Sequence, residues 1–182
     1  SLCMSISFGF ILYYVVFCIN LQHLKIQISF THTNFNYSVL ITKKNILASA
    51  KNTILSESQS IARLADYIDE NFFEATQKIY NSKGRLVVTG IGKSAIIAQK
   101  MVASFNSTGT PSLFLHASEA IHGDLGMIQS EDVIICISKS GNSPEIKVLV
   151  PLLKRFGNTL IAITGNMTSF LAQGSDIVLN TT

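Results

Sequence analysis

The chain has 182 residues with a formal net charge of +3 at pH 7, and 47% of its residues are hydrophobic while 14% are charged. This length suffices for one well-buried domain plus an appendage, but not for two full domains. The lysines are scattered rather than clustered, so nucleic-acid binding is not expected. The three cysteines lack paired spacing, which argues against a disulfide framework or a thiolate metal site and indicates a reducing, cytoplasmic compartment.

The first segment is unusually apolar. Residues 2–21 carry no charge and have about the length needed to cross a bilayer. No basic stretch precedes them and no clear small-residue cleavage site follows, so a cleaved signal peptide is not expected. The segment is either a membrane anchor or upstream sequence attached to a domain that begins near Ile41. Nothing downstream is adapted to a membrane, so we expect residues 1–42 to be an extension outside a domain of residues 43–182.

Residues 43–82 are expected to be helical. Their apolar side chains recur with a spacing close to 3.5 residues, and polar side chains fill the opposite face. A break is expected near Asn71, followed by a second helix that carries Phe72, Phe73 and Ile79. A long amphipathic stretch ahead of an α/β core either covers one face of the sheet or packs against another subunit.

From residue 85 onward, strand-like and helix-like runs alternate. Strands are expected at residues 86–90, 113–115, 132–137, 160–163 and 177–179, and helices at residues 94–105, 144–156 and 169–173. Because the strands are apolar on both faces, they predict an α/β fold with a parallel sheet covered by helices on both sides. The chain stops directly after the last strand, where a doubly wound domain normally continues with a helix. The domain is therefore expected to be incomplete at its C-terminus.

Two glycine-bearing turns each follow an apolar run and open a helix. They are residues 89–94 (TGIGKS) and residues 138–145 (SKSGNSPE). Hydroxyl groups, free backbone N–H groups and a helix N-terminus at the carboxyl end of a strand suit a phosphate group. Ser143 is the expected N-cap of the second helix, and Lys93 and Glu145 add groups suited to proton transfer. The second turn alone could be an ordinary strand–turn–helix link, but the pair predicts a sugar-phosphate enzyme.

Two better-known phosphate motifs fit the first turn less well. A Walker A loop requires glycine where Val87 stands, so that motif is absent. Residues 90–95 satisfy the G-x-G-x-x-A dinucleotide pattern, but this pattern also expects an acidic residue at the end of the second strand. His116 occupies that position, so dinucleotide binding is not expected.

Residues 116–127 (HASEAIHGDLGM) are expected to form a loop that gathers two histidines and two carboxylates around small residues. Loops at strand ends of α/β proteins are where active-site residues concentrate. With residues 92–94, 107–111 and 138–141, this loop resembles the sugar-isomerase (SIS) domain of arabinose 5-phosphate isomerases. The resemblance covers residues 46–182, and the histidine-containing loop is its most specific part.

The resemblance implies a three-layer sandwich with a five-stranded parallel sheet between helices, assembled as a homotetramer and often followed by a pair of CBS domains. It implies an aldose–ketose isomerase that interconverts D-ribulose 5-phosphate and D-arabinose 5-phosphate through an enediol, as the first step towards the Kdo sugar of lipopolysaccharide and some capsules. A sugar 5-phosphate is the expected partner, no cofactor is required, and neither nucleic acid nor a membrane is expected.

The resemblance also assigns residue roles. Lys93 and Glu145 fall on catalytic positions, and His116 falls on a position associated with bound zinc and substrate. The helix of residues 148–157 falls on substrate-contacting positions. Further substrate-contacting or phosphate-binding positions are occupied by Gly92, Ser94, Gly109, Thr110, His116, His122, Ser138, Ser140 and Ser143. We expect Lys93 to stabilise negative charge on the enediolate and Glu145 to be the base or to position one.

Two departures from the family pattern matter. Lys139 stands between the serines where the family usually has asparagine. The family's remaining catalytic glutamate and histidine lie beyond Thr182, so part of the active site is expected to be missing from residues 1–182. Two alternatives stay open: a non-catalytic sugar-phosphate-binding module, and an SIS isomerase acting on another sugar phosphate.

Overall fold

The computed structural model describes residues 43–181, and its sheet has the strand order β2-β1-β3-β4-β5 with every neighbouring pair parallel. The expected N-terminal extension, residues 1–42, lies outside the described residues. The strands are β1 (Leu86–Gly90), β2 (Ser112–His116), β3 (Val133–Ile137), β4 (Leu160–Thr164) and β5 (Ile177–Asn180). The expected five-stranded parallel sheet is therefore confirmed.

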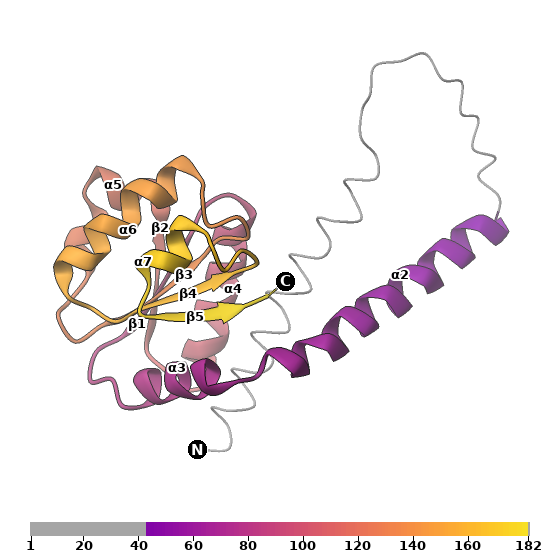
Figure 1. Cartoon of the computed structure of the whole chain (residues 1–182), viewed down its shortest axis with the longest axis horizontal. Coiled ribbons are helices and arrows are strands. Elements are labelled where there is room, and N and C mark those ends of the chain that lie inside the picture. Colours follow the sequence, from indigo (N-terminus) through magenta and orange to yellow (C-terminus); the bar gives the residue numbers. More distant parts are fainter. Residues whose placement is uncertain (1–42, 182) are drawn as a thin grey trace, which may run out of the picture.

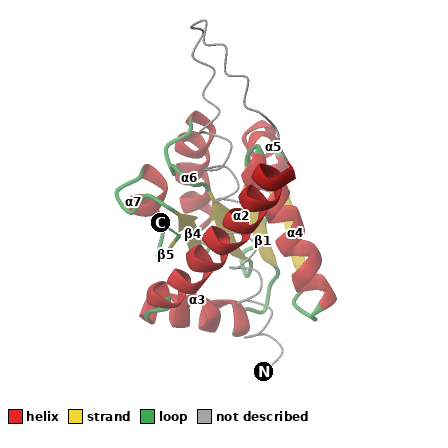
Figure 2. Ribbon diagram, turned by 90° about the vertical axis from the view of Figure 1, so that its right-hand side faces the viewer, coloured by secondary structure: helices red, strands yellow, loops and turns green. Residues whose placement is uncertain are grey.

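Helices cover both faces of this sheet, which gives three layers (Figure 2). Side chains alternate along each strand, so Ile135 and Ile137 of β3 face one side while Ile134 and Cys136 face the other. The first face packs against α3 (Glu70–Tyr80) and α4 (Lys93–Ser107). The second face packs against α5 (Ala117–His122), α6 (Pro144–Phe156) and α7 (Phe170–Gly174).

The expected helix over residues 43–82 is broken, but earlier than near Asn71. It consists of α2 (Lys43–Arg63), a 3₁₀ turn η1 (Leu64–Tyr67) and then α3. Asp69 determines where α3 begins, because its carboxylate accepts a hydrogen bond from the backbone N–H of Phe72 at 3.2 Å. Asp at this position satisfies one of the N–H groups that the first helical turn leaves without a partner.

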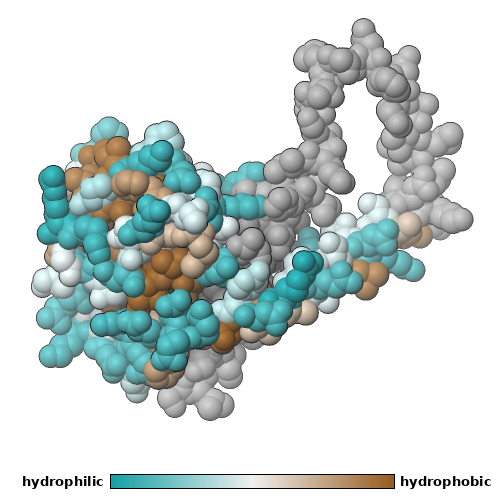
Figure 3. Space-filling model, viewed as in Figure 1, coloured by the Kyte–Doolittle hydropathy of each residue, from teal (hydrophilic) through white to brown (hydrophobic). Residues whose placement is uncertain are grey.

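The helix α2 projects away from the domain (Figure 1). Of the long amphipathic stretch, α3 covers the sheet, whereas Leu47, Ile54 and Leu55 of α2 are 52%, 67% and 60% exposed. These residues form apolar patches along an otherwise largely polar helix (Figure 3). Within the described residues, no helix combines the length and the apolar character needed to cross a membrane.

The expected loop over residues 116–127 is largely helical, which corrects the sequence-based prediction. It forms α5 and a second 3₁₀ turn, η2 (Asp124–Met127), separated by Gly123 at φ 137°. The buried face of α5 consists of Ala117 and Ala120. The helical period was missed because small alanines, rather than large apolar residues, contact the sheet.

The amino ends of β1 and β3 are held together by a buried carboxylate. The Asp132 side chain is fully buried and accepts hydrogen bonds from the Arg85 guanidinium and backbone N–H, and from the Gln129 backbone N–H. Burial disfavours the charged carboxylate, but the hydrogen bonds and the Arg85 charge outweigh it and lower the pKa of Asp132. Asn158 also joins this region by donating to the carbonyls of Gln129 and Asp132 at 2.8 and 2.7 Å.

Candidate functional site

The strand order brings the two glycine-bearing turns to the same edge of the sheet. The strand β1 lies beside β3, and Gly90 is in register with Ile137, the last residue of β3. After β1 the chain crosses to β2 on one side of the β1–β3 pair, and after β3 it crosses to β4 on the other side. Ligands of open α/β sheets bind at such a switch point, beyond the carboxyl ends of the strands.

An open depression of about 590 Å³ lies at this switch point. It is lined by Ile91, Lys93, Ser94, Ser138, Lys139, Ser140, Ser143 and Gly165. The structure therefore brings together expected site residues from both turns. Two lysines and no carboxylate are among the lining residues, so the depression favours an anionic group.

Glycine allows the first turn to run close to the strand ends. A Cβ on Gly90 would lie 3.0 Å from the carbonyl carbon of Ser94 and 3.2 Å from the carbonyl oxygen of Ile137. The following Gly92 has φ 57° and occupies the N-cap of α4 without a side-chain capping bond. The first turn of α4 consequently begins beside the depression, with Lys93 as its exposed first residue.

Two serine hydroxyls shape the second turn. The Ser138 Oγ accepts a hydrogen bond from the Gly141 N–H at 3.1 Å, and the Ser140 Oγ accepts one from the Asn142 N–H at 3.4 Å. Gly141 has φ 63°, a left-handed conformation that glycine adopts without the strain that a Cβ would cause.

Ser143 occupies the N-cap position of α6, as expected, but its hydroxyl makes no capping hydrogen bond. The Oγ atom is buried and has no hydrogen-bond partner among the described residues. A buried hydroxyl without a partner is costly, and a phosphate oxygen in the depression would supply one. The N-terminus of α6 adds a favourable dipole for the same anion.

A third loop, between β4 and α7, supports the second turn. The carbonyl oxygen of Lys139 accepts hydrogen bonds from the Gly165 N–H at 3.1 Å and from the Thr164 Oγ1 at 3.2 Å. The Asn142 Oδ1 accepts a hydrogen bond from the Phe170 N–H at 2.9 Å. Sequence reasoning missed this loop, although the pattern of a strand, Gly165 and a helix capped by Ser169 repeats that of the two turns.

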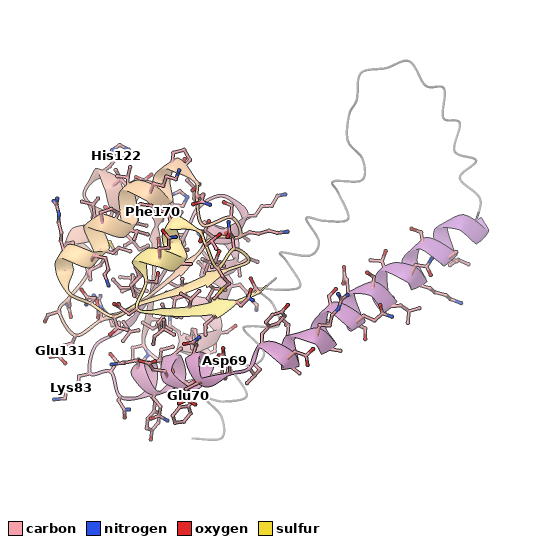
Figure 4. The ribbon with its side chains drawn as sticks, in the orientation of Figure 1. Asp69, Glu70, Lys83, His122, Glu131 and Phe170 are labelled. Atoms are coloured by element: carbon pink, nitrogen blue, oxygen red, sulfur yellow. The ribbon has the colours of Figure 1, made fainter. Side chains whose placement is uncertain are left out.

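Three other expected site residues, Glu145, His116 and His122, are not among the residues that line the depression. Glu145 is half-buried in the first turn of α6, and His116 is half-buried at the end of β2, in register with Gly90. The His116 ring makes an edge-to-face contact with Phe114, and its Nδ1 is buried with no partner among the described residues. His122 is exposed at the end of α5 (Figure 4).

Gly109 and Thr110 lie at the opposite end of the sheet. They precede β2 and line a different pocket, of about 230 Å³, near the amino ends of β1 and β3. Gly109 has φ 89°, and the Thr110 N–H donates to the carbonyl of Phe105 at 2.9 Å, so both help to end α4. Within one chain they are not brought together with the two turns, and their contact with substrate stays a prediction.

The resemblance associates His116 with bound zinc, but the described residues do not assemble a zinc site around it. In this part of the chain, no group of three or more His, Cys, Asp or Glu side chains is placed to hold a metal ion. His116 alone supplies too few ligands, since zinc sites in proteins typically use three or four. The free Cys136 is buried, and its burial raises the pKa of the thiol to about 12, which does not suit a thiolate ligand.

Comparison with known proteins agrees with this geometry. The model of the SIS domain matches residues 78–182. Arabinose 5-phosphate isomerase KdsD of Escherichia coli K12 is 48% identical over 131 residues, covering 72% of this chain and 40% of the relative. The protein of that name from Pseudomonas aeruginosa is 43% identical over 136 residues, covering 75% and 42%. The chain thus spans about two fifths of the length of these curated relatives.

A solved structure of the Escherichia coli CFT073 protein c3406 in complex with arabinose 5-phosphate has a TM-score of 0.74 and 38% sequence identity. The match covers 78% of this chain and 75% of that one. The family model covers more than half of the chain. This chain belongs to the SIS domain family.

Proposed function

We propose that the full-length protein is a sugar-phosphate isomerase that interconverts D-ribulose 5-phosphate and D-arabinose 5-phosphate. The curated relatives carry the name arabinose 5-phosphate isomerase, and a solved relative holds arabinose 5-phosphate. The observation that carries the proposal is the depression itself, which is lined by four serines and two lysines and includes Ser143, whose buried Oγ has no hydrogen-bond partner among the described residues. This arrangement suits the phosphate group of such a sugar.

In the proposed reaction, a base removes the proton from C2 of the open-chain aldose. The electrons of that bond form the C1–C2 double bond of an enediol, while the aldehyde oxygen takes up a proton. Return of a proton to C1, with loss of the proton from the oxygen on C2, gives the ketose. Atoms and charge balance, and the step requires no oxidant or reductant.

Lys93 and Glu145 have the chemistry that this proton transfer needs. Lys93 lines the depression at the start of α4, where its ammonium group would stabilise the negative charge that develops on the enediolate oxygen. Glu145 lies two residues after Ser143, on the helix whose N-terminus faces the phosphate, and would act as the base or hold one in place. No step is assigned to His116 or to a metal.

The wider setting forms part of the same proposal. A reaction that leads to Kdo, a homotetrameric assembly and a cytoplasmic location follow from the family resemblance. The exposed apolar residues of α2 support an assembly of several copies, because an amphipathic helix is stabilised by burying its apolar face. The free, buried Cys136 is consistent with a reducing compartment.

Isomerisation by the full-length protein in D₂O tests the proposal directly. The expected result is formation of D-ribulose 5-phosphate from D-arabinose 5-phosphate with deuterium at C1, detected by NMR, because an enediol exchanges its proton with solvent. The Lys93→Ala variant should keep the wild-type fold and lose turnover. Product whose C1 hydrogen comes entirely from C2 of the substrate would favour direct hydride transfer over an enediol. Binding of the sugar phosphate without any turnover would favour the non-catalytic alternative, and turnover of a different sugar phosphate only would favour the other isomerase.

A further inference from the structure

The depression contains a second cation, Lys139, whose role the proposed mechanism does not use. Lys139 lies in the second turn, between Ser138 and Ser140, whereas Lys93 comes from the first turn. The two lysines therefore line the same depression as the serines but come from different turns. An anion held at the serines would be within the field of both positive charges.

The backbone of Lys139 is held firmly in place. Its carbonyl oxygen accepts the hydrogen bonds from Gly165 and Thr164, which fixes the position from which the side chain departs. The stem of Lys139 starts beside Gly165, since a Cβ on that glycine would lie 3.8 Å from the Lys139 Cγ.

The surroundings of Lys139 make its charge available to a ligand. Burial of the side chain lowers the pKa of its ammonium group, which shows that the group has lost part of its contact with water. Among the described residues it forms no salt bridge, and no carboxylate lines the depression. A partly desolvated cation interacts more strongly with an anion than a fully solvated one does.

We propose that Lys139 is a phosphate-binding residue that makes this site discriminate strongly between phosphorylated and neutral sugars. The inference rests on the proposed function, because it requires that the phosphate group of the sugar occupies the depression. Lys139 would donate a charge-assisted hydrogen bond to a phosphate oxygen, while Ser138, Ser140 and Ser143 set the orientation of the group. Its effect is on binding, so it should alter KM far more than kcat.

The test compares three variants of the full-length protein by isothermal titration calorimetry. Lys139→Met keeps the length of the stem and removes the charge, and Lys139→Arg keeps the charge. Lys83→Met makes the same charge change on an exposed lysine that precedes β1, at the opposite end of the sheet (Figure 4). Each is titrated with D-arabinose 5-phosphate, with inorganic phosphate and with unphosphorylated D-arabinose, and thermal unfolding confirms the fold.

Lys139→Met should weaken binding of both phosphorylated ligands about tenfold, as expected for loss of one charge-assisted hydrogen bond. The same variant should bind D-arabinose as the wild type does. Its affinity for the phosphorylated ligands should fall less steeply than that of the wild type as NaCl is added. The affinity of Lys139→Arg for both phosphorylated ligands should stay within about threefold of the wild-type affinity. The affinity of Lys83→Met should equal that of the wild type. A wild-type affinity in Lys139→Met, or an equal loss in Lys83→Met, overturns the role of Lys139. No binding of either phosphorylated ligand by the wild type overturns the proposed function instead.

Discussion

Replacement of Gly141 by alanine should both destabilise the protein and disturb the second turn. Gly141 has φ 63°, and a Cβ there would lie 2.5 Å from the Cβ of Ser169 and closer still to its hydroxyl oxygen. A left-handed conformation costs an alanine about 1–2 kcal/mol. Forcing a methyl group against the cap of α7 costs about 1–3 kcal/mol more. The total loss, about 2–5 kcal/mol, is a large part of the 5–15 kcal/mol typical of a domain.

Gly157→Ala is a matched control, because Gly157 has φ 75° but no atom within 4 Å of an added Cβ. Urea denaturation of both variants, followed by circular dichroism, separates the backbone strain from the close contact. Gly157→Ala should lose about 1–2 kcal/mol, and Gly141→Ala should lose clearly more. Equal losses in the two variants would refute the claim that the β4–α7 loop packs tightly beneath the turn. Gly141→Ala should also bind sugar phosphate less tightly, because the Gly141 N–H bonds to the Ser138 hydroxyl.

The buried carboxylate of Asp132 should make stability depend on pH. Its folded-state pKa is lowered, so its contribution is present above the unfolded pKa, about 3.9, and disappears as the pH falls through the folded value. Asp132→Asn should lower the free energy of unfolding by about 2 kcal/mol at pH 7, as expected for weakened hydrogen bonds to a charged group. In urea titrations from pH 6 to pH 2.5 its stability should fall less steeply with decreasing pH than that of the wild type, and an equally steep fall would contradict this. Asn158→Ala should cost about 2 kcal/mol in the same assay, since it removes the side-chain donor to the buried carbonyl of Asp132. The Cys136 thiol, with a pKa of about 12, should react with a disulfide reagent only at the rate of unfolding. Peptide mass mapping separates its labelling from that of Cys3 and Cys18, and rapid labelling of Cys136 itself in the native protein would refute its burial.

The sheet could be predicted because the sequence signals and the packing agree. Each strand is a short apolar run bounded by glycine or polar residues, and each lies in the buried middle layer, so local pattern and tertiary environment favour the same structure. The two glycine-bearing turns could be located for a similar reason. Glycine and serine at a strand end serve the backbone geometry of each turn, and the pattern is visible without knowledge of distant contacts.

Features that depend on contacts between distant segments could not be predicted. The Asp132 carboxylate and the Asn158 amide look like ordinary loop residues until β1, β3 and β4 lie side by side. The failure of Ser143 to cap α6 also cannot be read locally, since the same residue type at the same position usually caps. The hydroxyl that departs from the usual pattern belongs to a residue that lines the candidate phosphate site, where such departures are expected.

The predicted substrate residues occupy both ends of one sheet, and this separation limits how they can act together. The strand β2 has five residues and spans about 13 Å at ~3.3 Å per residue. Thr110 precedes its first residue, whereas His116 and the depression lie at its other end. A sugar phosphate held by Ser143 therefore cannot also contact Thr110 of the same chain. If Thr110 does contact substrate, that substrate is bound by another copy of the chain. Activity then depends on assembly, and assembly would bury the exposed apolar residues of α2 against another copy.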